Sequence, residues 1–418
     1  MKAIKNSALF RRLFIFLAIL GPGIITANVD NDAGGITTYS VAGASFGYTL
    51  LWVFIPMTIA LIVVQEMAIR MGIVTGKGLA DLIRENYGVR TTLIVMATLF
   101  LGDMGNTVSE FAGIAASMQI FGVSKYVSVP IAAVLIWYLV VRGSYKTVER
   151  AFLVASALYF SYVFSGTMAN PPWNEVMREM ITPSFNFGSD YLAMLIGLIG
   201  TTIAPWMQFY IQSSIVEKQI TIDEYKYSRL DVVIGCFMMS IIAIFIVVAC
   251  SATIHSAGIT IESAGDAALA LEPLAGKWAS TLFAFGLLNA SIFSAAILPL
   301  STSYSISEAF GFEAGLNKSW QKAPVFYSLF TAQIAIGAGI ILLPDVPLLK
   351  VMLWSQVVNG VLLPFVLIFS LQMINNKDLM GKYTNSRTFN VIAWVTSIIM
   401  ICLTLLLVIA SIFPDFLG

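Results

Sequence analysis

An eight-residue polar run interrupts the first apolar stretch of this chain and limits what the chain can fold into. Residues 28–35 read Asn-Val-Asp-Asn-Asp-Ala-Gly-Gly, and apolar sequence lies on both sides of them. One Asp at the centre of a membrane helix costs about 2.5–3.5 kcal/mol on insertion scales, and this run holds two, Asp30 and Asp32. The paired glycines favour non-helical backbone, which a bilayer tolerates only where it is buried in protein or lines a wet cavity. The run therefore predicts a broken helix that holds a cation.

The composition places the chain in a lipid bilayer. Of its 418 residues, 58% are hydrophobic and 11% are charged, whereas a soluble domain has about 25% charged residues. The formal net charge is zero, so no basic surface indicates a nucleic-acid partner. All three cysteines lie inside apolar stretches and indicate no disulfide framework. We predict an all-α integral membrane protein.

Eleven membrane spans can be placed on the sequence if each needs about 20 apolar residues. They lie near 12–42 (broken), 46–69, 91–121, 126–141, 148–168, 188–216 (broken), 230–254, 278–310, 324–343, 348–374 and 388–413. Lys and Arg concentrate on the cytoplasmic side of membrane proteins. If the N-terminus is cytoplasmic, 19 of these residues fall inside and 4 outside. The charge distribution therefore predicts eleven spans, a cytoplasmic N-terminus and an external C-terminus.

A second interruption lies five spans after the first. Residues 200–206 read Gly-Thr-Thr-Ile-Ala-Pro-Trp, and Pro205 removes a backbone donor and clashes with the preceding turn. Pro205 either opens this span or merely kinks it. Its position favours opening, because breaks at matching positions are typical of inverted repeats with a binding site between them. We expect two repeats and an extra helix, at about 12–168, 188–374 and 388–413.

Several motifs resemble the Nramp family of divalent-metal transporters. They are Gly-Pro-Gly at 21–23, Ala-Gly-Ala-Ser-Phe-Gly-Tyr at 42–48, Gln-Glu-Met-Ala at 65–68, Gly-Leu-Leu-Asn-Ala-Ser at 286–291 and Leu-Pro-Phe at 363–365. The resemblance covers nearly the whole chain. It implies a LeuT-like fold of five plus five inverted spans, with helices 1 and 6 broken, and transport by alternating access. It also implies a transporter rather than an enzyme, with no cofactor.

The chain departs from the family pattern at the expected binding site. The family's Asp-Pro-Gly-Asn falls on residues 32–35, so the carboxylate of Asp32 is kept but the amide becomes Gly35. The family's Met-Pro-His falls on residues 204–206, so Ala204 replaces the thioether and Trp206 replaces the imidazole. This pattern resembles the Nramp-related magnesium transporters, a prokaryotic branch, and implies the inner (plasma) membrane of a bacterium.

These departures favour a hard cation. A thioether suits transition metals, whereas carboxylate, carbonyl and water suit Mg²⁺, which keeps several waters and binds through one or two carboxylates. The predicted site takes its charge from the carboxylate of Asp32. By family position, the backbone carbonyls of Val29 and Thr201 face the ion. The small residues Gly35 and Ala204 leave space for water. Two amides in span ten, Gln356 and Asn359, border the site.

Asp30 is a second carboxylate in this run, at a position where the family pattern has none. It either adds a second carboxylate to the site or caps the second half of helix 1, whose N-terminus attracts negative charge.

Coupling to protons is expected to be lost. The family's Asp on its proton route falls on Thr107, although Glu110 is kept, and Trp206 either fills the space of the histidine or narrows a gate. Glu110 and Asp103 either form a residual relay or pair with an arginine such as Arg70. We therefore expect uncoupled Mg²⁺ uptake by a monomer, with Mn²⁺ as a further substrate.

Other functions remain as alternatives. The first is proton-coupled Mn²⁺ or Fe²⁺ transport within the same family. A sodium-coupled amino-acid transporter of the same fold needs neutral half-helix ends rather than an acidic run. An intramembrane protease would use Gly-Asp at 102–103, for which no partner motif is evident. A metal sensor without transport is the last alternative.

Overall fold

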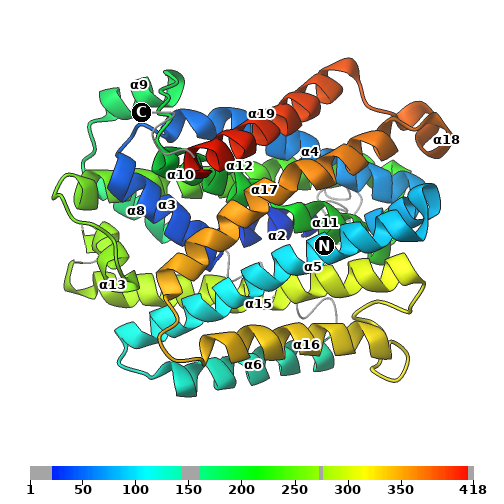
Figure 1. Cartoon of the computed structure of the whole chain (residues 1–418), viewed down its shortest axis with the longest axis horizontal. Helices are drawn as coiled ribbons and strands as arrows, with labels where there is room; N and C mark the ends of the chain where they lie inside the picture. The colour runs from blue at the N-terminus through cyan, green and yellow to red at the C-terminus, as the bar shows by residue number, and fades with distance from the viewer. Residues whose placement is uncertain (1–20, 144–159, 273–275, 413–418) are drawn as a thin grey trace, which may run out of the picture.

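The computed structural model describes residues 21–143, 160–272 and 276–412, and within these ranges the chain forms helices and connecting segments but no strand (Figure 1). The helices up to residue 181 are α2 (Pro22–Val29), α3 (Ala33–Phe46), η2 (Leu51–Val53), α4 (Phe54–Thr75), α5 (Leu79–Ile120), α6 (Lys125–Arg142), α8 (Phe160–Met168) and α9 (Trp173–Ile181). The later long helices are α10 (Ser189–Thr202), α11 (Pro205–Glu217), α12 (Tyr225–Cys250), α15 (Ala279–Phe310), α16 (Pro324–Ile341), α17 (Leu348–Asn375) and α19 (Arg387–Ile412). Short helices between them are η4 (Ile222–Glu224), η5 (Ser251–His255), α13 (Ala264–Ala267), η6 (Ala268–Leu271), η7 (Gly276–Trp278), α18 (Lys377–Met380) and η8 (Gly381–Tyr383).

The predicted fold class is confirmed. Nine helical segments of the described chain are long and apolar enough to cross a membrane, with α10 and α11 counted as one. The first and fifth expected spans are not among these nine. The start of the first lies outside the described residues, and so does most of the fifth, of which α8 is the described part. The boundaries of the two inverted repeats stay a prediction.

Both expected breaks are present. Helix 1 ends after Val29 and resumes at Ala33, and helix 6 ends after Thr202 and resumes at Pro205. Pro205 occupies the first turn of α11, where a missing N–H costs nothing. The sequence at 200–206 therefore opens the helix instead of kinking it.

Glycines bring the helices around the two breaks into close contact. A Cβ on Gly200 of α10 would lie 2.3 Å from the backbone nitrogen of Gly360 on α17. A Cβ on Gly23 of α2 would lie 2.6 Å from the backbone of Val232 on α12. The carboxylate of Asp231 also accepts hydrogen bonds from the N–H groups of Gly21 (3.2 Å) and Gly23 (2.6 Å). This carboxylate satisfies amides that the start of α2 would otherwise leave unpaired.

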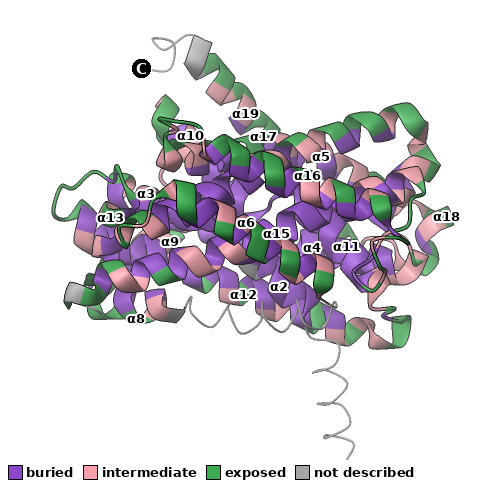
Figure 2. Ribbon diagram, turned by 90° about the horizontal axis from the view of Figure 1, so that it is seen from below, coloured by how far each residue is buried: buried purple, intermediate pink, exposed green. Residues whose placement is uncertain are grey.

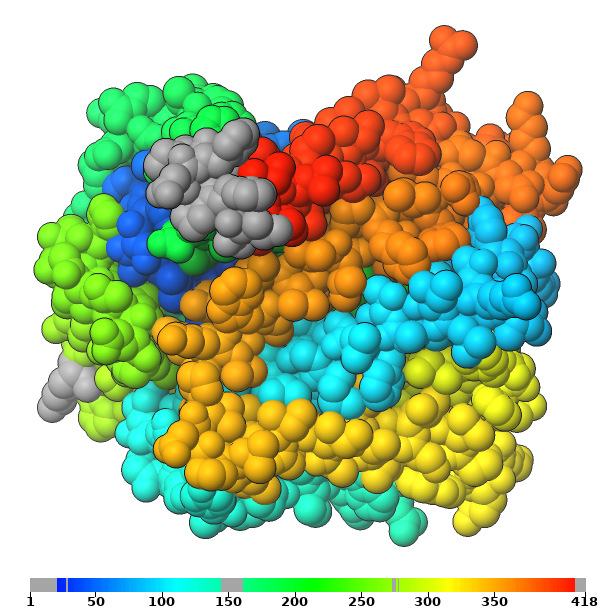
Figure 3. Space-filling view, in the orientation of Figure 1, coloured from blue at the N-terminus to red at the C-terminus, as the bar shows by residue number. Residues whose placement is uncertain are grey.

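The buried residues gather around α2, α11, α12 and α15, and exposed residues lie on the outer helices (Figure 2). Large apolar side chains on α19 are exposed, among them Val391, Ile398 and Leu405. Such a surface is expected where a helix faces lipid. On the face in Figure 3, α17 lies between α5 and α19, and it packs against α3 and α10 of the broken helices.

Candidate cation site

At the break in helix 1, two carboxylates accept hydrogen bonds from the first N–H groups of α3. Asp32 is the N-cap of α3, and its Oδ1 accepts a 2.5 Å hydrogen bond from the N–H of Gly35. Glu110 of α5 accepts a 3.2 Å bond from the N–H of Ala33 through Oε2. Negative charge is stabilised at a helix N-terminus by these free N–H groups and by the helix dipole. Oε1 of Glu110 has no hydrogen-bond partner among the described residues.

Both breaks leave backbone carbonyls without their helical partners. In a continuous helix the carbonyl of Thr201 would accept from residue 205, but Pro205 has no N–H. The carbonyl of Val29 would accept from Ala33, whose N–H donates to Glu110 instead. From the described part of the chain, the carbonyl oxygen of Val29 accepts a 3.4 Å hydrogen bond from the hydroxyl of Ser294. The two carbonyls that the family resemblance assigned to the cation are thus largely free.

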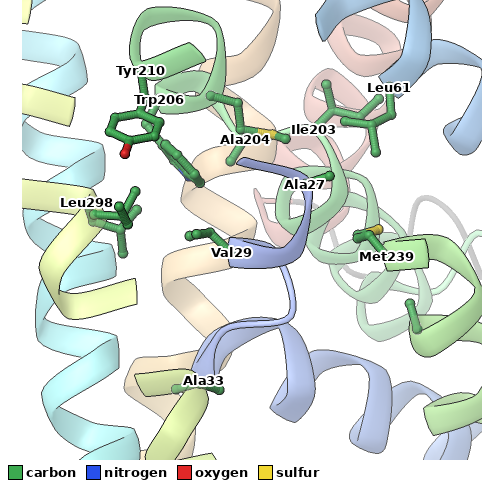
Figure 4. Packing of buried hydrophobic residues seen from close by; sticks show 14 of the residues in the cluster. Ala27, Val29, Ala33, Leu61, Ile203, Ala204, Trp206, Tyr210, Met239 and Leu298 are labelled. Carbon is green, nitrogen blue, oxygen red and sulfur yellow. The ribbon is translucent and has the colours of Figure 1, made fainter. Parts of the chain in front are cut away.

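The two breaks touch each other. The hydroxyl of Thr201 lies 3.5 Å from the carbonyl oxygen of Asp30, and the hydroxyls of Tyr39 and Thr202 are 3.3 Å apart. In Figure 4, Ala27 and Val29 lie before the helix 1 break and Ala33 after it, with Ala204 and Trp206 on the neighbouring helix. The residues expected from both broken helices are therefore gathered in one place.

Gly35 does not leave room for water in this conformation, contrary to the sequence-based expectation. A Cβ on Gly35 would lie 2.0 Å from the carbonyl oxygen of Asp30 and 3.0 Å from the hydroxyl of Thr201. The missing side chain instead lets the backbone of the break fold against α3. Ala204 is the extended N-cap of α11 and is 2% exposed, so it presents only a methyl group to the site.

Asp30 does not cap α3, because Asp32 does, so that alternative is wrong. Asp30 is 2% exposed, and neither of its carboxylate oxygens has a hydrogen-bond partner among the described residues. The amide of Asn31 is also buried and unpartnered in the same part of the chain. The role of Asp30 as a second carboxylate of the site stays a prediction.

Within the described residues, neither Asp103 nor Glu110 of α5 pairs with an arginine, contrary to one sequence-based alternative. Asp103 accepts a 2.6 Å hydrogen bond from the hydroxyl of Thr302 on α15. Arg70 pairs with Glu66 at 3.0 Å on its own helix. Glu110 contacts the site directly through the start of α3.

The two residues at the family's proton-route positions, Thr107 and Trp206, are both buried. Thr107 is fully buried and donates its hydroxyl to the carbonyl oxygen of Asp103. Trp206 is 2% exposed, and its ring lies 6.0 Å from that of Tyr210. This burial agrees with Trp206 filling space in the protein interior.

Gln356 and Asn359 of α17 border the break, but their amides bond to each other. The Nδ2 of Asn359 donates to Oε1 of Gln356 at 3.1 Å and to Oδ1 of Asn106 at 2.8 Å. Asn106 of α5 returns a 3.2 Å bond to Oδ1 of Asn359. Sequence reasoning missed Asn106, although a buried amide within a membrane helix is itself a signal of a functional or structural contact.

The electrostatics of the site favour a cation. Asp30, Asp32 and Glu110 are at most 4% exposed, and within the described residues none of them forms an ion pair with Lys or Arg. Buried carboxylates without a compensating positive charge are costly. The described residues contain no group of three or more His, Cys, Asp or Glu placed to hold a metal. A bound cation would therefore need carbonyl oxygens or water in addition to carboxylates.

The fold and the site define a class of protein, a membrane transporter with an acidic site between two broken helices. The sequence matches the profile described as natural resistance-associated macrophage protein-like over residues 23–410, so the chain belongs to the Nramp family. It is 27% identical over 409 residues to the divalent metal cation transporter MntH of Deinococcus radiodurans, covering 93% of this chain and 88% of that protein. It is 27% identical over 413 residues to MntH of Yersinia enterocolitica, covering 95% and 96%.

Solved structures agree on the fold. A mutant of the Eremococcus coleocola manganese transporter superposes with a TM-score of 0.79 at 22% identity, covering 96% of this chain and 88% of that one. MhsT in complex with L-phenylalanine superposes with a TM-score of 0.60 at 13% identity, covering 92% and 98%. The fold is thus LeuT-like, and the family's members are described as transporters of divalent metal cations, not as enzymes.

Proposed function

We propose that this protein mediates Mg²⁺ uptake, and also carries Mn²⁺, by alternating access without coupling to protons. The observation that carries the proposal is the residue at the helix 6 break. Ala204 is buried there and offers a methyl group, so the donors offered by the breaks are carboxylate, carbonyl, hydroxyl and amide. Oxygen donors suit Mg²⁺, whereas a sulfur donor would favour transition metals.

We propose that the carboxylates of Asp32 and Asp30 bind the ion. Neither carboxylate oxygen of Asp30 has a hydrogen-bond partner among the described residues. Mg²⁺ commonly binds one or two carboxylates while keeping several waters. We expect the carbonyls of Val29 and Thr201 to contact the ion directly or through water. Mg²⁺ is the substrate of this site, and we expect the protein to need no cofactor.

Two cavities support alternating access. One of 660 Å³ lies at the end of α5 and is lined by Ile120, Asp345 and Met352. The other, of 510 Å³, lies at the start of α5 and is lined by Asp81, Glu217 and Glu308. The site residues are buried, and Glu110, which accepts a hydrogen bond from the start of α3, lies on α5 between these two ends. The hydroxyl of Thr37 approaches the sulfur of Met352 at 3.5 Å, between the first cavity and the helix 1 break.

The membrane potential would drive uptake. We place the N-terminus in the cytoplasm of a bacterial cell and the C-terminus outside, so that the acidic cavity faces inward. Moving two charges through 100 mV gains about 4.6 kcal/mol, which corresponds to accumulation on the order of a thousandfold. A monomer is sufficient, because the proposed site lies within one chain.

The second candidate is proton-coupled Mn²⁺ or Fe²⁺ transport. It is favoured by the relatives described as divalent metal cation and manganese transporters and by Glu110, a carboxylate at the site with one unpartnered oxygen among the described residues.

Competition between Mn²⁺ and Mg²⁺ separates the two candidates. We expect a small excess of Mn²⁺ to leave most Mg²⁺ uptake intact in the wild-type protein. In Ala204→Met we expect the same excess to inhibit strongly. The proposal fails if wild-type uptake of Mg²⁺ is absent, or if trace Mn²⁺ already abolishes it.

A further inference from the structure

The amide side chains next to the helix 1 break form a short hydrogen-bonded chain across two helices. Asn106 on α5 and Asn359 on α17 exchange two hydrogen bonds, of 3.2 and 2.8 Å, and Asn359 donates a third to Gln356 at 3.1 Å. All three residues are at most 2% exposed. Because buried amides without partners are costly, this arrangement holds each side chain in one orientation.

The orientation of Gln356 decides what it offers to a cation. Its Oε1 accepts from Asn359, on the side of α5. Its Nε2 lies against the first turn of α3, where a Cβ on Gly34 would be only 1.9 Å away. The end of Gln356 that faces the helix 1 break is thus the amide nitrogen. An amide N–H donates hydrogen bonds and cannot coordinate a cation, whereas its oxygen can.

We infer that the Asn106–Asn359 pair is a specificity-determining contact, which keeps the carbonyl oxygen of Gln356 turned away from the cation. The inference rests on the proposed function. With Gln356 held in this way, an ion meets fewer fixed side-chain oxygens and keeps more of its water. Mg²⁺ dehydrates reluctantly, so this arrangement favours Mg²⁺. Released from Asn359, Gln356 could turn its oxygen towards the site, which would favour ions that shed water more readily, such as Mn²⁺.

The test measures the dissociation constants of Mn²⁺ and Mg²⁺ for the purified full-length protein by calorimetry. In Asn106→Ala and Asn359→Ala we expect affinity for Mn²⁺ relative to Mg²⁺ to rise about fivefold, the equivalent of one hydrogen bond of about 1 kcal/mol. The rise should disappear when Gln356→Ala is added to either variant, because no carbonyl remains to turn. Asn106→Ser, which is smaller than Asn and cannot reach both partners, should show the same shift if Asn106→Ala does not fold.

The chain offers a matched control on the same helix. Asn375 of α17 and Asn390 of α19 also exchange two amide hydrogen bonds, both of 2.8 Å, outside the site. Asn375→Ala should leave the ratio of affinities unchanged. The inference is overturned if the affinity for Mn²⁺ relative to Mg²⁺ stays constant in the Asn106 variants. It is also overturned if this ratio rises equally when Gln356→Ala is present, or if Asn375→Ala causes the same rise. A wild-type protein that binds Mn²⁺ but neither binds nor transports Mg²⁺ would refute the proposed function, while the Mn²⁺ affinities of the variants would still decide the inference.

Discussion

Asp32 has two roles that one pair of substitutions can separate. Its Oδ1 caps α3 through the N–H of Gly35, and its charge would hold the cation. Asn caps a helix about as well as Asp, whereas replacing the cap by Ala costs about 0.5–2 kcal/mol. We therefore expect the free energy of unfolding of Asp32→Asn to lie within about 0.5 kcal/mol of the wild-type value. For Asp32→Ala we expect it to be lower by about 1 kcal/mol or more.

Cation binding should respond differently from stability. Two unit charges 4 Å apart interact by about 4 kcal/mol at an effective dielectric constant of about 20, and a divalent ion doubles that attraction before its water is displaced. The attraction between Asp32 and a divalent ion is thus about 8 kcal/mol. One third of that value, about 2.7 kcal/mol, already corresponds to a hundredfold change in affinity. Both variants should therefore lose at least about a hundredfold in Mg²⁺ affinity.

The assay combines thermal unfolding in detergent with Mg²⁺ titration of the same samples. The expected pattern is equal loss of binding in both variants with loss of stability mainly in Asp32→Ala. Binding by Asp32→Asn at close to the wild-type affinity would refute the assignment of Asp32 as the charge that holds the ion.

Three further substitutions test other parts of the account. Gly35→Ala should lower the free energy of unfolding by about 1–2 kcal/mol, because a Cβ there would lie 2.0 Å from a backbone carbonyl oxygen of the break. Gly105→Ala is the control: a Cβ there would meet no other part of the chain within 4 Å, so it should be neutral or stabilising in the same thermal measurement. Pro205→Ala restores an N–H that can bond the carbonyl of Thr201, so Mg²⁺ affinity measured by calorimetry should fall about tenfold; unchanged affinity would exclude that carbonyl as a ligand. Asp231→Ala removes two hydrogen bonds to the start of α2, each worth about 1.5–3 kcal/mol when one partner is charged. The midpoint temperature of thermal unfolding should therefore fall clearly. An unchanged midpoint would contradict the role of Asp231 in anchoring α2.

The breaks could be predicted from the sequence because their causes are local. Pro205 lacks an N–H whatever surrounds it, and an acidic run is costly inside a membrane helix. The expectation that the two glycines are non-helical is wrong, because Gly34 and Gly35 lie in the first turn of α3. The burial of Asp32, Thr201 and Ala204 follows from the fold that the motifs imply, and all three are at most 4% exposed. Their role as a cation site stays a prediction.

The contacts between distant segments could not be predicted. Nothing near Gly35 in the sequence indicates that the hydroxyl of Thr201, on α10, lies beside it. The pairing of Asn106 with Asn359 joins residues 253 positions apart. These contacts depend on how α3 packs against α10 and how α5 packs against α17, which a pattern of apolar residues describes only as burial.

The central claim is that a hydrated divalent cation crosses this protein driven by the membrane potential alone. Proteoliposomes loaded with a pH-sensitive dye and a Mg²⁺ indicator test it directly, with a potassium diffusion potential, negative inside, as the only driving force. The account predicts Mg²⁺ entry that grows with the potential and no acidification of the lumen coupled to it. Proton movement in fixed proportion to the Mg²⁺ that enters, or uptake of Mn²⁺ alone, would contradict it.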